Sequence, residues 1–219
     1  MSTGPTPTDR HAGLTRLQMA LMALGVLLLM VLVVDRIFFH ASSTPAGTGS
    51  GVAKSQARAL PPFTTVDLVG ANNVVVHVGR KQSVIVQADS NLLGRVTTRV
   101  RAGTLLIGTT PGDLSAKTPM FVAVSMPALD ALKLEGAGNI TATGTATKLD
   151  VTLSGAGNTF LRQLVARDAR AVLSGDGNIA LTATRSLAAT LSGRGTVFYS
   201  GNPPHVTRTI TGSGVISAQ

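Results

Sequence analysis

A short glycine-containing phrase, repeated five times toward the end of this 219-residue chain, constrains the fold more than any other feature. The copies read LEGAGNIT at residues 134–141, LSGAGNTF at 153–160, LSGDGNIA at 173–180, LSGRGTVF at 191–198 and ITGSGVIS at 210–217. Their first glycines, at 136, 155, 175, 193 and 212, are 19, 20, 18 and 19 residues apart. A fixed period of this size is typical of a solenoid, in which each repeat stacks on its neighbour.

Apolar and polar residues alternate before each glycine corner, as in Leu149, Val151 and Leu153. This period of two predicts strands with one buried face. We expect the paired glycines to turn the chain sharply by adopting positive φ angles. The sequence therefore predicts an all-β domain over residues 61–219, built as a parallel β-helix-like solenoid with rungs of about 19 residues.

Three copies carry asparagine at the same corner position, at Asn139, Asn158 and Asn178. Stacked in register, these amides are expected to form a hydrogen-bonded ladder that stops where Thr196 replaces asparagine. The phrase LVGANNVV at residues 68–75 reads as an early, degenerate copy. Residues 61–127 otherwise predict short strands joined by tight turns, which we expect to cap the start of the stack.

Composition excludes several classes of chemistry. The chain has no cysteine, so disulfides, thiol catalysis and zinc–thiolate sites are excluded. Aromatic residues make up only 3% and there is no tryptophan, which argues against large ring-lined pockets. Beyond residue 40 there are 16 Lys and Arg against 8 Asp and Glu, a net charge of +8, which favours anionic partners.

The N-terminal part predicts attachment to a membrane. Residues 1–16 form a polar tail, and residues 17–34 are an uncharged run of 18 residues, about 27 Å long as a helix. We expect a transmembrane anchor over 17–39; a cleaved signal peptide is the alternative, although no convincing cleavage site follows. Arg10 and Arg16 favour a cytoplasmic N-terminus. Residues 40–60 predict a flexible linker, with residues 40–219 outside the cytoplasm.

The string VAVSMPALDALKLEGAGNI at residues 122–140, followed by the recurring LSGxG corners, resembles a bacterial family described as putative auto-transporter adhesin, head GIN domain. The resemblance covers residue 61 to the end. It implies a right-handed, parallel β-helix-like fold outside the inner membrane or on the cell surface, with no established catalytic activity. It supplies no functional residues to carry over.

No catalytic, cofactor or metal site is predicted. The candidate carboxylates Glu135, Asp150, Asp168 and Asp176 do not recur at matched positions, as paired glycosidase carboxylates would. The four histidines lack metal-ligand spacing: His11, His40, His77 and His205. The recurring serines have no recurring histidine: Ser154, Ser174 and Ser192. The Gly-x-Gly corners lack the third glycine and the helix of a dinucleotide site.

Six arginines lie between or beside the corners and would form a cationic stripe if they shared one face: Arg162, Arg167, Arg170, Arg185, Arg194 and Arg208. Nucleic acid is not the expected partner, because stacking aromatics are scarce.

The sequence thus predicts a single-pass membrane protein carrying a non-enzymatic binding or adhesion module. Its expected partner is an anionic envelope polymer or another protein, and a homo-oligomer through the open end of the stack is a further expectation. Two alternatives stay open: a carbohydrate-active β-helix enzyme, and a structural accessory protein of the envelope.

Overall fold

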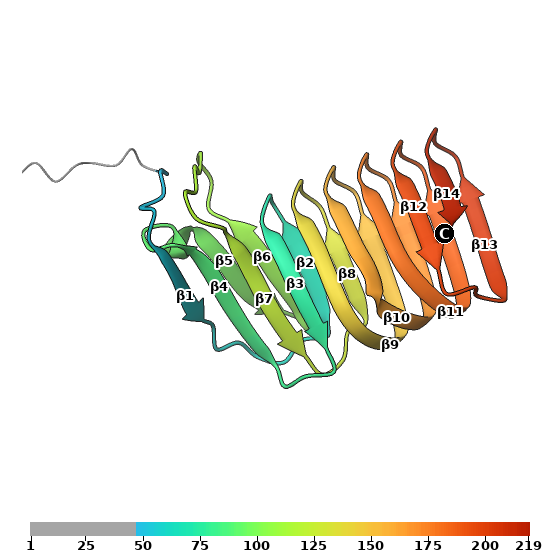
Figure 1. The fold of residues 1–219 in the computed structure, drawn as a ribbon, viewed down its shortest axis with the longest axis horizontal. Helices are drawn as coiled ribbons and strands as arrows, with labels where there is room; N and C mark the ends of the chain where they lie inside the picture. The colour runs from blue at the N-terminus through green and yellow to red at the C-terminus, as the bar shows by residue number, and fades with distance from the viewer. Residues whose placement is uncertain (1–46) are drawn as a thin grey trace, which may run out of the picture. The chain divides into compact units, whose positions relative to one another are not determined.

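The computed structural model describes residues 47–219, which form one 14-stranded sheet and a short 3₁₀ helix (Figure 1). The first strands are β1 (Ala53–Ala57), β2 (Thr65–Val69), β3 (Asn73–Val78), β4 (Ser83–Asp89), β5 (Val96–Arg101), β6 (Thr104–Thr109), β7 (Phe121–Met126) and β8 (Ala131–Leu134). The long strands β9 (Asn139–Leu153), β10 (Asn158–Leu173) and β11 (Asn178–Leu191) follow. The chain ends in β12 (Thr196–Ser200), β13 (His205–Ile210) and β14 (Val215–Ala218), and the helix η1 spans Leu93–Arg95.

The predicted all-β class is confirmed, and successive repeats pair in parallel as expected. Asn158 pairs with Asn139 and with Asn178, and Leu173 pairs with Leu153 and with Leu191. These partners are one repeat apart, so the repeat and the register agree. Among residues 47–219, no helix has the length and apolar character needed to cross a membrane. The predicted anchor over 17–39 and the polar tail lie outside the described residues.

The sheet curls so that its strands form two layers around one core. One layer consists of β6, β2, β8 and β13 together with the second halves of β9, β10 and β11. The other layer consists of β7, β3, β12 and β14 together with the first halves of β9, β10 and β11. Each long strand bends from one layer to the other, as Figure 1 shows for β9 to β11. In β9 the bend lies at Gly144, where φ is +119°.

Inward side chains stack in register and fill the core. One column contains five leucines, all of them fully buried: Leu68, Leu134, Leu153, Leu173 and Leu191. Burying each such side chain contributes about 1.5–3 kcal/mol relative to leaving it in water. The alternation of apolar and polar residues therefore places the side chains whose burial stabilises the packing of the two layers.

The order of stacking differs from the order of the chain. Strand β2 pairs with β6 on one side and β8 on the other, and β3 likewise lies between β7 and β9. The early copy of the repeat is therefore inserted between two later segments. Asn73 of this copy pairs with Asn139, which confirms that LVGANNVV belongs to the repeat.

The glycine corners work differently from the prediction. Positive φ angles occur at eight described glycines, but the corner pairs from Gly136 to Gly214 are not among them. These glycines are needed because the backbone of the next corner passes too close for a side chain. A Cβ at Gly155 would lie 2.0 Å from the carbonyl oxygen of Gly136, and one at Gly175 would lie 1.9 Å from that of Gly155.

The predicted asparagine ladder is present. Asn158 donates to Asn139 at 3.2 Å, and Asn178 donates to Asn158 at 2.9 Å. Asn139 in turn donates to Asn73 at 3.0 Å, so the ladder also includes the early copy. The aligned position on β12 is Thr196, where the ladder was expected to stop.

Part of the predicted linker is ordered structure. Strand β1 lies within residues 40–60 but pairs antiparallel with β4 along its whole length. The Asp89 carboxylate, at the end of β4, accepts hydrogen bonds from the backbone N–H groups of Gly51, Lys117 and Thr118. Burial alone would raise the pKa of Asp89, but these donors hold it below its ordinary value. The segment from Gly47 onward is therefore part of the domain.

Candidate functional site: an uncharged outer face

The two outer surfaces of the domain differ in chemistry. We call the outer side of one layer the uncharged face; its strand segments are 121–126, 73–78, 139–143, 158–161, 178–183, 196–200 and 215–218. None of these segments contains Asp, Glu, Lys or Arg. The opposite surface, here the charged face, carries Arg99, Arg101, Asp67, Lys133, Glu135, Asp150 and Arg170 at outward positions. In a described domain with net charge +8, an uncharged face this wide points to a specific use.

The uncharged face is organised in columns that run across the strands. The asparagine ladder forms the first column. The second column lies two residues further along each strand and contains Ala123, Val75, Thr141, Phe160, Ala180, Phe198 and Ser217. The third column carries hydroxyl and imidazole groups, among them His77, whose Nδ1 lies 2.9 Å from the hydroxyl of Thr143. Adjacent strands are about 4.8 Å apart, so each column presents one chemical group at that interval.

Three aromatic rings lie on this face, and one of them is exposed. Of the five aromatic residues in the described range, Phe63 and Tyr199 are buried in the core. The other three, Phe121, Phe160 and Phe198, all point outward from the uncharged face, and Phe160 is 51% exposed. Large exposed rings are uncommon away from binding surfaces, because each leaves apolar area in water.

A β-bulge shapes a pocket beside Phe160. The register of β10 against β9 shifts between Phe160 and Gln163, and against β11 it shifts between Leu161 and Val165. Such bulges bend a strand and re-aim its side chains. Here the result is a pocket of about 270 Å³, which we call the bulge pocket, lined by Thr141, Phe160, Arg162, Gln163 and Ala180. The guanidinium of Arg162 hydrogen-bonds the side-chain oxygen of Gln219.

The six arginines do not form a single stripe. Arg185 makes a bidentate pair with Asp168, at 2.7 and 2.6 Å, and Arg194 makes one with Asp176, at 3.0 and 2.5 Å. Arg170 points outward from the charged face, opposite Asp150 of the neighbouring strand. Arg162 lies at the bulge, and Arg167 is an exposed residue in the middle of β10, where that strand passes from one layer to the other. The six arginines therefore do not share one face, which is the condition that a cationic stripe would require.

Arg208 occupies an inward position at the end of the stack. It is aligned with the buried Ala189 of β11, in the column that also contains Ala171. Its guanidinium lies 5.1 Å from the centre of the Tyr199 ring and hydrogen-bonds the phenolic oxygen. An inward-pointing charge on an edge strand is one of the devices by which proteins protect exposed sheet edges.

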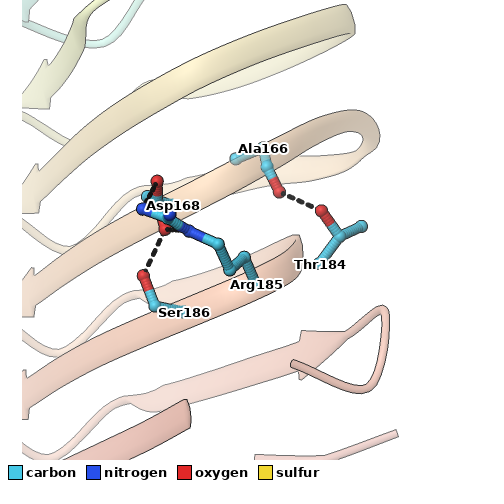
Figure 2. Close-up of polar contacts among 5 residues, drawn as sticks. All are labelled: Ala166, Asp168, Thr184, Arg185 and Ser186. Carbon is cyan, nitrogen blue, oxygen red and sulfur yellow. Dashed lines mark hydrogen bonds and ion pairs between the residues drawn. The ribbon is translucent and has the colours of Figure 1, made fainter. Parts of the chain in front are cut away.

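The candidate carboxylates are mostly held by structural partners. Figure 2 shows Asp168 between Arg185 and Ser186, whose hydroxyl donates to it at 2.6 Å. The hydrogen bonds from Arg185, and then that from Ser186, lower the pKa of Asp168 to about 2. Asp168 and Asp150 line one shallow hollow of about 160 Å³ on the charged face. An acid ionised so strongly is a poor proton donor at neutral pH, so Asp168 is unsuited to the general-acid role in glycoside cleavage.

Asp67 is a buried carboxylate that sequence reasoning missed. It lies between Leu106 and Lys133 in the register of the charged face, and its Oδ1 atom has no hydrogen-bond partner. Burial raises its pKa; Glu135 adds to this effect, while Lys133 opposes it.

The remaining predicted positions are dispersed. His205 is exposed at the start of β13, whereas Ser154, Ser174 and Ser192 line up just before successive corners. Within residues 47–219, no three His, Asp or Glu side chains are grouped as metal ligands would be. His11 and His40 lie outside the described residues. The uncharged face itself was missed, although its signal is in the sequence: the four or more residues that directly follow each corner lack charge, and two of these segments contain an outward phenylalanine.

The fold and the face together define an all-β domain, built on a curled sheet, with a broad uncharged face and shallow pockets. The family model described as putative auto-transporter adhesin, head GIN domain, matches residues 62–143 and again 132–203, and the chain belongs to this family. This confirms the resemblance stated above. No curated protein matches the chain.

Several crystal structures are similar to this chain. A putative adhesin from Bacteroides fragilis is 18% identical, with a TM-score of 0.49, over 78% of this chain and 99% of that one. A putative lipid binding protein from Parabacteroides distasonis is 19% identical, with a TM-score of 0.39, over 78% and 98% of the two chains. A putative adhesin from Parabacteroides merdae is 15% identical, with a TM-score of 0.38 and the same coverage.

Proposed function

We propose that this protein is a non-catalytic binding module of the cell envelope that contacts its partner through the uncharged face. The observation that carries the proposal is the gathering of Phe121, Phe160 and Phe198 on an outer surface without charge. Aromatic rings are enriched at recognition surfaces, because they bring a large apolar area with few rotatable bonds. Membership of an adhesin-like family supports a binding role.

We further propose that the domain is held at the outer side of a membrane. The uncharged run at residues 17–34 supports an anchor over 17–39 that follows the tail at 1–16. The linker would then end before Gly47, because β1 and the Asp89 hydrogen bonds belong to the domain. Residues 40–219 would lie outside the cytoplasm.

The parallel pairing of successive repeats supports a further structural proposal. We infer that the rungs wind as a right-handed, β-helix-like solenoid, since each long strand passes from one layer to the other before the next corner. In that arrangement the uncharged face is a rigid surface whose columns keep their spacing. A rigid surface loses little conformational entropy on binding.

The C-terminal end of the stack is where a homo-oligomer would form. Strands β13 and β14 leave one edge unpaired, and Ile210 and Val215 are 47% and 55% exposed there. We propose that Arg208 limits this pairing, because a second copy stacked on β13 would have to bury its guanidinium. Association through this edge would therefore be weak in the unmodified protein.

The proposal is tested by co-sedimentation of the detergent-solubilised full-length chain with cell envelopes from which the lipid has been extracted, so that the proposed anchor has no bilayer to enter. We expect binding to persist when the Debye length falls from about 10 Å at 0.1 M salt to about 3 Å at 1 M. The double variant Phe160→Ala/Phe198→Ala should lose binding, whereas the matched charged-face variant Lys133→Ala/Arg170→Ala should keep it. Binding that salt abolishes, or that only the charged-face variant loses, would overturn the proposal in favour of an electrostatic anchor.

A further inference from the structure

We propose that the bulge pocket is a subsite for one pyranose ring of a neutral glycan chain, with the ring stacked on Phe160. This inference rests on the proposed function and names the chemistry of its partner. It is built from three features of the described domain: an exposed flat ring, polar groups placed around it, and a repeat of the same chemistry further along the face.

The Phe160 ring is open to a flat ligand. Its neighbours in the same column are Thr141 on β9 and Ala180 on β11, both much smaller than a phenyl ring. The ring therefore stands above its surroundings and is 51% exposed. The C–H groups on one face of a pyranose are apolar and slightly positive, so they match the negative face of an aromatic ring.

The wall of the pocket is mostly apolar, and the side chains that form it include polar groups but no negative charge. The pocket is lined by Gln163, Arg162 and Thr141. The amide of Asn158 is a further polar group on this face, because Asn158 lies two residues before Phe160 on the same strand. Sugar hydroxyls both donate and accept hydrogen bonds. Amide and hydroxyl side chains offer both functions, and a guanidinium adds donors in a fixed fork.

Apart from Arg162, the residues that line the pocket are uncharged, which favours a neutral partner. An acidic polymer would gain more on the opposite surface, where Lys133 and Arg170 point outward. At the pocket, the guanidinium of Arg162 already has a hydrogen-bond acceptor in Gln219. A lipid surface would bury the asparagine ladder and the hydroxyl column against hydrocarbon, which is unfavourable for groups that water now satisfies.

A second ring on the same column favours a chain over a single sugar. Phe198 lies two strands beyond Phe160, with the small Ala180 between them. Two strand spacings are about 10 Å, which is close to the length of a disaccharide unit in an extended β-linked glycan. A pocket of about 270 Å³ holds one ring, and Phe198 on the same column provides the next stacking position.

The test is isothermal titration calorimetry of the full-length chain with cellohexaose and with chitohexaose. A polyoxyethylene detergent is used, because detergents with sugar headgroups would compete. Phe160→Ala should weaken binding about tenfold or more, equivalent to about 1.4 kcal/mol. Phe160→Tyr keeps a flat ring and should stay within about threefold of the unmodified protein, equivalent to about 0.7 kcal/mol.

Two further variants separate stacking from other contacts. Phe160→Leu keeps apolar area but not a flat ring, so it should behave like the alanine variant. Arg170→Ala on the charged face is the matched control and should bind as the unmodified protein does. Thermal unfolding of each variant shows whether it has kept its fold.

The inference is overturned if neither neutral hexasaccharide binds saturably, if Phe160→Leu binds as well as the unmodified protein, or if hexagalacturonate binds in their place. Failure here leaves the proposed function standing when envelopes still bind through Phe160 and Phe198, since the partner would then be of another chemistry. Loss of envelope binding by the unmodified protein would refute the proposed function itself.

Discussion

Replacement of Gly175 by alanine is expected to destabilise the domain by roughly 3–5 kcal/mol. The new Cβ would lie 1.9 Å from the carbonyl oxygen of Gly155, and ordinary contacts begin at 3.4 Å, so one corner must move by 3.4 − 1.9 = 1.5 Å. That movement breaks the hydrogen bonds from Ser174 N to Leu153 O and from Asp176 N to Gly155 O. Two such bonds contribute about 1 kcal/mol each, and overpacking adds about 1–3 kcal/mol.

The assay is urea unfolding of the full-length chain in detergent, followed by far-ultraviolet circular dichroism. In thermal unfolding of the same samples, a loss of roughly 3–5 kcal/mol corresponds to a fall in Tm of roughly 6–20 °C for a domain of this size. Gly94→Ala is the control, because a Cβ there meets nothing within 4 Å and the backbone needs no positive φ; it should change stability by less than about 0.5 kcal/mol. If Gly175→Ala is as stable as the control, the close approach of successive corners is refuted.

Four further predictions follow from the described domain. Asn158→Ala removes two ladder hydrogen bonds and should cost about 1–2 kcal/mol in urea unfolding, whereas Asn178→Ala removes one and should cost about half as much. The pKa of Asp168 in the folded protein lies below its ordinary value, so the ionised carboxylate stabilises the fold fully above about pH 4, and this stabilisation is lost as the pH falls toward about 2. The difference in stability between the unmodified protein and Asp168→Asn should therefore shrink between about pH 4 and about pH 2. A difference that stays constant over this range would contradict the prediction. Arg208→Leu should increase self-association in sedimentation velocity, and unchanged association would show that Arg208 does not protect the edge. A fragment beginning at Gly47 should give a β-rich circular dichroism spectrum, and a disordered spectrum would show that the domain needs the preceding residues.

The family and the all-β class could be predicted because the repeat is local. Alternation, glycine corners and a period near 19 residues appear within single repeats, and the ladder of Asn139, Asn158 and Asn178 follows from stacking them in register. The sequence predicted correctly where the corner glycines are needed, but not why they are needed. A glycine at position 175 indicates that a side chain is excluded there, and either a positive φ angle or a close carbonyl oxygen would have this effect. The structure shows that the carbonyl oxygen of Gly155 is the cause.

The sequence by itself determined the repeat, its register, and the face on which Phe160 is exposed while the leucines are buried. Only the tertiary structure decided the insertion of β2 and β3 between later strands, because that pairing joins segments far apart in the chain. The tertiary structure also decided which arginines are paired with a carboxylate. Arg185 is paired because Asp168, 17 residues earlier in the chain, lies on the neighbouring strand. The same holds for the bulge pocket, since a shift in register brings Gln163 beside Thr141 and Phe160. Local patterns fix which side of a strand is buried, whereas contacts between distant segments depend on which strands become neighbours.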